Sequence, residues 1–143
     1  MLVEAHSQIP FSNRGQQISL IIERIVQQAC WSRITGIFAY ATASGVLELL
    51  SATESLSPTP SLWWLFGMDD CLTEPGAIDL ARSQGGIVRV ASFMNARRRF
   101  HPKVLHFTNN DSAADAVIIG SANLTLNGLT KNAEAISILH AES

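Results

Sequence analysis

The sequence is poor in charge, and this scarcity excludes one class of nucleic-acid-binding protein. Charged residues make up only 15% of the 143 residues, and the formal net charge is −2. A protein that coats itself with nucleic acid displaces counterions with many Lys and Arg side chains, so only a local basic site is compatible with this composition. The hydrophobic share of 47% leaves much apolar surface to bury, and we expect an oligomer interface to bury part of it.

Cysteines and long apolar runs are also scarce. Cys30 and Cys71 are the two cysteines. They are too few for a disulfide framework and lack metal-ligand spacing, which favours two reduced, packed thiols in a reducing compartment. No apolar run approaches the roughly 20 residues of a membrane helix, and no secretory leader pattern opens the sequence. We therefore expect a cytoplasmic protein without a membrane span.

The length predicts one domain, because a chain of this size can bury roughly 70% of its unfolded surface in a single core. Residues 1–14 show no clear period and are expected to form a loose arm. Residues 15–143 are expected to form the single domain.

From residue 15 onward the hydrophobic pattern alternates between two periods. Three- and four-residue steps after Gly15, Thr42 and Thr73 predict helices, and short apolar runs predict strands at 34–41, 62–67, 87–93, 103–107, 115–121 and 134–141. Alternating helices and strands predict crossover connections. The fold class is therefore α/β, with a mixed, mainly parallel central sheet flanked by helices on both faces. Trp63 and Trp64 lie in a continuous apolar run and are expected in the core rather than on a base-stacking surface.

Polar groups converge on one end of the last three predicted strands. His101 and Lys103 share a strand face because alternate residues point the same way, and Pro102 between them suits a strand start. Ser121 and Asn123 follow a buried strand that ends in Gly120, and their hydroxyl and amide suit a phosphate oxygen.

Glu134 stands at the entrance of the last strand between two alanines. A buried carboxylate is costly unless it is paired, so a partner is expected, and a histidine would serve. A carboxylate that holds the Nδ1 proton of a histidine leaves Nε2 free to attack. Asn132 and Thr125 are either further site residues or a turn-forming Asn and a helix-capping Thr.

These residues resemble the phospholipase D superfamily, and within it the compact, single-motif nuclease-like members. HPKVLHF at 101–107 is similar to the H-x-K motif of that family, and AVIIGSANLTLNGLTKNAEA at 116–135 is similar to its G-S-x-N, L-T-x-x-G-L and N-x-E elements. A looser resemblance extends the match to residues 34–141. The family motif carries an Asp five positions after the Lys, where this chain has Thr108; that Asp is usually a support outside the chemistry.

The resemblance implies a phospholipase D-like fold and two-step phosphodiester cleavage without a metal or other cofactor. His101 would attack phosphorus, and a second histidine would protonate the leaving oxygen and then activate water. Lys103 and Asn123, with Ser121, would stabilise the charge on the phosphate oxygens, and Glu134 would orient a histidine. The chain holds one motif copy where the mechanism needs two, so a homodimer is expected to complete one shared site.

The substrate is less constrained than the chemistry, because fold and motif specify only a phosphodiester. Cleavage of DNA is the first hypothesis, since Arg97, Arg98 and Arg99 stand directly before the site, either to bind phosphates or as an ordinary solvated turn. A phospholipid hydrolase or transferase and a noncatalytic nucleic-acid-binding module are the alternatives. A partner subunit would supply any target specificity.

Overall fold

The structure, a computed structural model, describes residues 1–10, 17–93, 97–110 and 114–141. Within these residues the chain forms one sheet with strand order β1-β7-β6-β5-β2-β3-β4 and a layer of helices. In chain order the elements are β1 Leu2–Gln8, α1 Ile18–Val26, β2 Arg33–Phe38, α2 Ala43–Thr53, β3 Ser61–Gly67, α3 Pro75–Ser83, β4 Ile87–Ala91, β5 Lys103–Thr108, β6 Asp115–Gly120, α4 Leu126–Thr130 and β7 Glu134–Ala141. No helix among the described residues is long and apolar enough to cross a membrane.

The sheet is mixed, as predicted, but parallel pairing is confined to β2, β3 and β4. The other neighbouring pairs, β2 with β5, β5 with β6, β6 with β7 and β7 with β1, are antiparallel. The expectation of a mainly parallel sheet differs from the structure because the regular helix–strand alternation ends after β4. A short connection follows β5 and returns the chain antiparallel, whereas the chain passes from β6 to its antiparallel neighbour β7 through helix α4.

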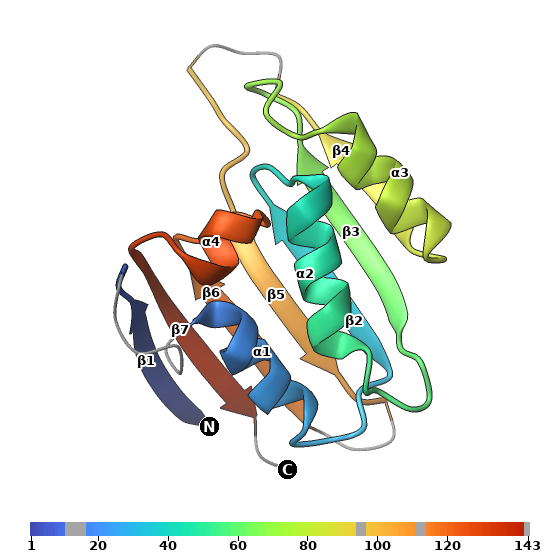
Figure 1. Cartoon of the computed structure of the whole chain (residues 1–143), viewed down its shortest axis with the longest axis vertical. Coiled ribbons are helices and arrows are strands. Elements are labelled where there is room, and N and C mark those ends of the chain that lie inside the picture. Colours follow the sequence, from blue (N-terminus) through green and yellow to red (C-terminus); the bar gives the residue numbers. More distant parts are fainter. Residues whose placement is uncertain (11–16, 94–96, 111–113, 142–143) are drawn as a thin grey trace.

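The helices pack on one face of the sheet rather than on both (Figure 1). Helix α2 contacts α1, α3 and α4, so the four form a single layer. Strands β2, β3 and β4 advance across the sheet in one direction, and two right-handed crossovers that advance the same way place their helices on the same side. Trp64 faces this layer and is 2% exposed, whereas Trp63 faces the opposite side and is 40% exposed. The prediction of a core position is therefore confirmed for Trp64 and wrong for Trp63. On the open face, the guanidinium of Arg33 lies 5.5 Å from the centre of the Trp63 ring.

Residues 2–8, expected to belong to a loose arm, form an edge strand paired with β7. An edge strand is only partly buried, so both of its faces can carry polar residues. The sequence of this strand therefore shows no regular alternation of polar and apolar residues. Gln8 anchors its end: the amide Nε2 donates to Gly128 O at 3.0 Å and to Asn132 O at 2.9 Å, and Oε1 accepts from Ile18 N. Residues 11–14 of the expected arm lie outside the described part of the chain.

The two cysteines are unpaired, as expected for reduced thiols, but Cys30 and Cys71 are both exposed rather than packed. Cys30 follows α1, and Cys71 lies in the turn after β3. The expectation of packed thiols came from their small number and their spacing, which do not report burial; their loop positions place both at the surface.

The first turn of α2 packs directly on the backbone of the segment that follows β6. Thr42 caps the helix, since its Oγ1 accepts from Gly45 N at 3.1 Å, and Thr42 N donates to Leu124 O at 3.0 Å. A Cβ atom at Gly45 would lie 2.1 Å from Leu124 O. Only glycine therefore allows this approach, which fixes the segment carrying Ser121 and Asn123.

Gly45→Ala is expected to lower the free energy of unfolding by about 3 kcal/mol, because neither backbone can yield without displacing the other. Gly76→Ala is the matched control in α3, where the nearest atom to a new Cβ is 3.7 Å away. That exposed helical site should gain up to about 1 kcal/mol. Urea unfolding of both variants measures the two changes, and equal effects would contradict the proposed role of the close contact.

Candidate active site

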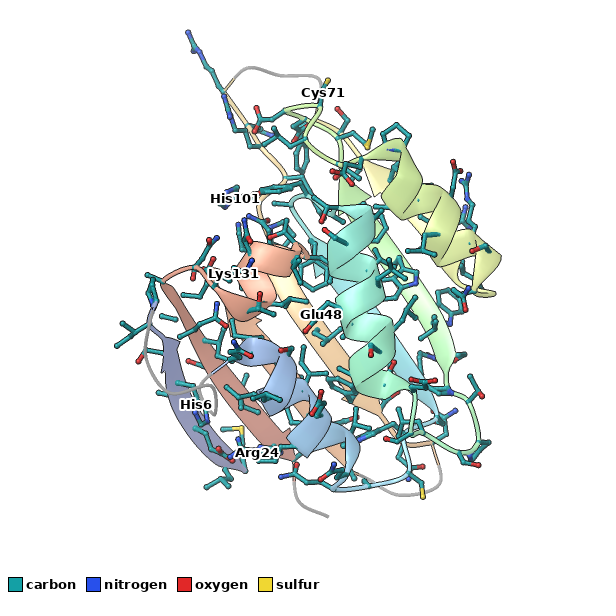
Figure 2. All side chains as sticks on the ribbon, viewed as in Figure 1. His6, Arg24, Glu48, Cys71, His101 and Lys131 are labelled. Carbon is teal, nitrogen blue, oxygen red and sulfur yellow. The ribbon has the colours of Figure 1, made fainter. Side chains whose placement is uncertain are left out.

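The strand register brings the predicted residues to one end of the sheet. Val104 pairs with Ile119, and Gly120 pairs with Ile136. The first residues of β5 and β7 and the last residue of β6 therefore share this end, and His101 directly precedes β5. Figure 2 shows His101 at this end of the molecule, with His6 and Arg24 toward the opposite end.

Lys103 lies under His101 in the interior of this end. Its ammonium Nζ is 2.9 Å from His101 Nδ1 and 3.2 Å from His101 O. The Lys103 side chain is 8% exposed, while His101 is exposed. Burial lowers the pKa of Lys103, and the negative charge of Glu134 opposes that shift. The pair thus combines an accessible imidazole with a partly desolvated cation.

Glu134 is held by a serine and an asparagine rather than by a histidine. Ser121 Oγ donates to Glu134 Oε2 and accepts from Ala135 N at 3.1 Å. Asn132 Nδ2 donates to the other carboxylate oxygen at 3.3 Å. Asn132 therefore contacts a predicted site residue, while Thr125 caps α4 by accepting from Gly128 N at 2.9 Å.

Asn123 lies on the same strand-end segment, between Ser121 and the cap of α4. Its backbone oxygen accepts from Thr125 N at 2.8 Å. Its side-chain Oδ1 is buried, and no hydrogen-bond partner among the described residues satisfies it. An unsatisfied buried amide oxygen is costly, and it is a group that a bound molecule can satisfy.

The three predicted arginines lie in the segment that extends beyond the sheet between β4 and β5 (Figure 1). All three are exposed. Arg99 Nη1 pairs with Asp70, at 2.7 and 2.8 Å from its two carboxylate oxygens. Part of the positive charge before His101 is thus compensated by a neighbouring carboxylate.

Asp69 is a site-positioning residue that sequence reasoning missed. Its Oδ2 accepts from Phe100 N at 2.6 Å, and its Oδ1 accepts from Phe93 N at 2.7 Å and from Ser92 Oγ at 2.8 Å. These bonds, first that from Phe100, hold the pKa of Asp69 below its ordinary value. One carboxylate therefore fixes both ends of the segment that leads to His101.

A signal for Asp69 was present in the sequence. A polar residue directly after the carboxyl end of a parallel strand lies where sites on α/β sheets are commonly built, and Asp69 follows β3 by two positions. Among the described residues, no group of three or more His, Cys, Asp or Glu side chains could hold a metal ion.

Comparisons with known proteins agree with the motif and the fold. A sequence model of the NgoFVII restriction endonuclease N-terminal PLD domain matches residues 34–143. No curated protein matches the sequence. NucT from Helicobacter pylori superposes with a TM-score of 0.61 at 12% identity, over 96% of this chain and 85% of that protein.

Two further solved structures share the fold. Nuc, a phospholipase D family member from Salmonella typhimurium, gives a TM-score of 0.53 at 20% identity, over 94% of this chain and 82% of that one. The polyphosphate kinase from Porphyromonas gingivalis gives 0.58 at 11% identity, over 96% of this chain but only 23% of the kinase. At such identities the likeness establishes the architecture, and the predicted phospholipase D-like fold is confirmed.

Proposed function

Since the chain belongs to the family of the NgoFVII restriction endonuclease N-terminal phospholipase D (PLD) domain, we propose that it is a nuclease that cleaves DNA through a phosphohistidine intermediate, without a metal. The observation that supports this most directly is the convergence of His101 and Lys103 with the Ser121–Glu134 pair at one end of the sheet. Phosphodiester chemistry requires a nucleophile beside groups that stabilise the phosphate charge, and this end supplies both.

In the first step His101 attacks the phosphorus atom. A phosphorus–nitrogen bond forms, the bond from phosphorus to the leaving oxygen breaks, and a second histidine gives the leaving oxygen a proton. In the second step that histidine takes a proton from water, whose oxygen attacks phosphorus and releases His101. Phosphate ends as a monoester, and both histidines return to their starting state.

The remaining groups act on the phosphate oxygens and on the histidine. Lys103 lies close enough to His101 to bind a non-bridging oxygen during the attack, and its partial burial strengthens that interaction. Asn123 and Ser121 are proposed to donate to the same oxygens. Glu134 would orient a histidine, in place of or alongside its bonds to Ser121 and Asn132.

The second histidine is proposed to be His101 of the partner subunit in a homodimer. The other histidines of the chain face different surroundings: His106 pairs with Asp115 at 3.5 Å, and His6 and His140 lie at 3.0 and 3.2 Å from Glu4. A two-fold axis beside the exposed His101 would bring two copies of the motif to one site. Sedimentation of the purified protein tests this assembly, and a monomer that cleaves DNA would contradict it.

The direct test of the activity is cleavage of labelled single- and double-stranded DNA in excess EDTA across a salt series. Metal-independent cleavage is expected to persist in EDTA and to weaken as salt rises, because contacts to phosphates release counterions. Complete loss of cleavage in EDTA, restored by a divalent cation, would contradict the mechanism.

The alternatives predict other outcomes. Hydrolysis of phosphatidylcholine vesicles, with DNA left uncleaved, would favour the lipid alternative. DNA binding by a folded dimer that cleaves neither would favour the noncatalytic module and, with it, a partner subunit that supplies the activity.

The proposal also includes a reducing, cytoplasmic location, supported by the two unpaired cysteines.

A further inference from the structure

A polar hollow adjoins the proposed reaction site, and no step of the mechanism uses it. Its volume is about 420 Å³, which lies within the range of pockets that bind small molecules. It lies between the segment after β2, the first turn of α2, the first turn of α4 and the turn before β7. The lining includes Tyr40, Thr42, Ser44, Thr125, Asn127 and Asn132.

Two connections tie this hollow to the site. Ala39 N donates to Pro102 O at 2.7 Å, so Tyr40 and His101 flank one inter-strand hydrogen bond. On the other wall, Asn132 Nδ2 donates to Glu134 Oε1 at 3.3 Å. A group in the hollow would therefore lie beside a phosphate bound at His101.

The lining has the chemistry of a nucleobase site rather than of a second phosphate site. It carries hydroxyls, amides, one aromatic ring and the aliphatic side chain of Leu126, and no charged side chain. A phosphate would call for cations, whereas a neutral base stacks on an aromatic ring and exchanges hydrogen bonds with amides, which both donate and accept. The ring belongs to Tyr40, the single tyrosine of the chain, and the amides belong to Asn127 and Asn132. Substitutions can therefore test the ring and the amides separately.

We infer that this hollow binds the base of an unpaired nucleotide next to the phosphate under attack, with Tyr40 stacking on the base and Asn127 and Asn132 bonding its edge. The inference rests on the proposed function and adds a substrate class to it. A base in an intact duplex is stacked and paired, so it must be extruded or already single-stranded to enter such a hollow. The preferred substrate is therefore single-stranded DNA or a duplex with an unpaired nucleotide.

Equilibrium binding tests this without relying on cleavage. In a His101→Ala background, fluorescence anisotropy compares a labelled twelve-residue thymidine oligonucleotide with an abasic strand of the same length. Adding Tyr40→Leu is expected to weaken binding of the thymidine strand roughly 10-fold, because an aromatic stacking surface is lost. Binding of the abasic strand should stay the same, and adding Tyr40→Phe, which keeps the ring, should retain most of the affinity for thymidine.

An unchanged affinity for the thymidine strand would overturn the inference, and so would an equal loss on both strands, since the effect would then not involve the base. If Tyr40→Leu does not fold, as judged by thermal melting, Asn127→Ala removes an exposed amide from the same hollow and should also weaken thymidine binding selectively. Hydrolysis of bis(p-nitrophenyl) phosphate by the wild-type protein is measured in parallel. If the wild-type protein does not hydrolyse this compound but binds the thymidine strand as expected, the result counts against the proposed function and not against the base site.

Discussion

His101→Ala is expected to reduce DNA cleavage by at least about 10⁴-fold, the largest effect of any single substitution proposed here. In a homodimer the substitution removes the nucleophile and, through the partner subunit, the acid and base as well, and each of these roles alone contributes a large factor. The side chain is exposed, so the free energy of unfolding should change by no more than about 0.5 kcal/mol. Cleavage rates in EDTA and urea unfolding measure the two quantities.

His106→Ala is the matched control for this loss. The same side chain is removed from the same strand region, but His106 lies on the opposite face of β5 and pairs with Asp115. We expect cleavage by this variant to stay near the wild-type rate. If the two variants lose activity equally, the chemistry does not depend on the predicted histidine. A second check is to trap the covalent intermediate between the protein and the DNA strand. Its phosphorus–nitrogen bond should break in acid, and only proteins with His101 should form it.

Lys103→Met is expected to reduce cleavage by about 10²–10³-fold, which is the usual loss when a donor to a developing phosphate or oxyanion charge is removed. Unlike most substitutions of a buried residue, this one should leave the protein at least as stable at neutral pH. Methionine keeps the apolar length of the lysine stem and removes the charge whose burial lowers the pKa of Lys103.

The stability effect has a defined pH dependence. Because the pKa of Lys103 in the folded chain lies below its ordinary value of 10.5, the unfolded chain binds more protons between those two pKa values. The free energy of unfolding of the wild type should therefore rise with pH through that window, and the penalty for burying the charge is fully present below it. In Lys103→Met this contribution is absent, so the gain relative to wild type should be largest near neutral pH and shrink as pH approaches 10.5.

Lys131→Met controls for the change in net charge. Lys103 and Lys131 are the only lysines of the chain, and Lys131 is exposed at the same end of the molecule. Its replacement should leave the stability profile and most of the cleavage rate intact. A drop in stability for Lys103→Met, or equal activity losses in the two variants, would contradict the role assigned to Lys103.

Most of the element order could be predicted from the sequence because long apolar periods report directly on burial. The helix capped by Thr42, the buried strands and the β5–β6 hairpin follow from such periods. Edge strand β1 and the short helix α4 lack them: one is only partly buried, and the other spans five residues. Whether the helices cover one face or both depends on whether successive parallel strands are added on the same side of the sheet or on opposite sides. The hydrophobic pattern of a single helix or strand does not indicate this order.

The site was predictable to the same extent. His101, Lys103, Ser121 and Glu134 lie in or beside the adjoining ends of three consecutive strands, so their convergence could be expected. The attachment of the His101 segment to Asp69 could not be expected, and the contact of Asn132 with Glu134 was one of two alternatives that the sequence left open. The Asp69 bonds join a carboxylate to backbone groups far from it in the sequence, so they form only after those segments have packed.

The attachment at Asp69 has a consequence for variation within this part of the chain. Both of its loop donors, Phe93 N and Phe100 N, are backbone groups, which every residue except proline can supply. Substitutions other than proline at positions 93 and 100 should therefore leave both bonds to the one carboxylate in place. The position of His101 should then depend on the Asp69 carboxylate and not on which side chains stand at those two positions.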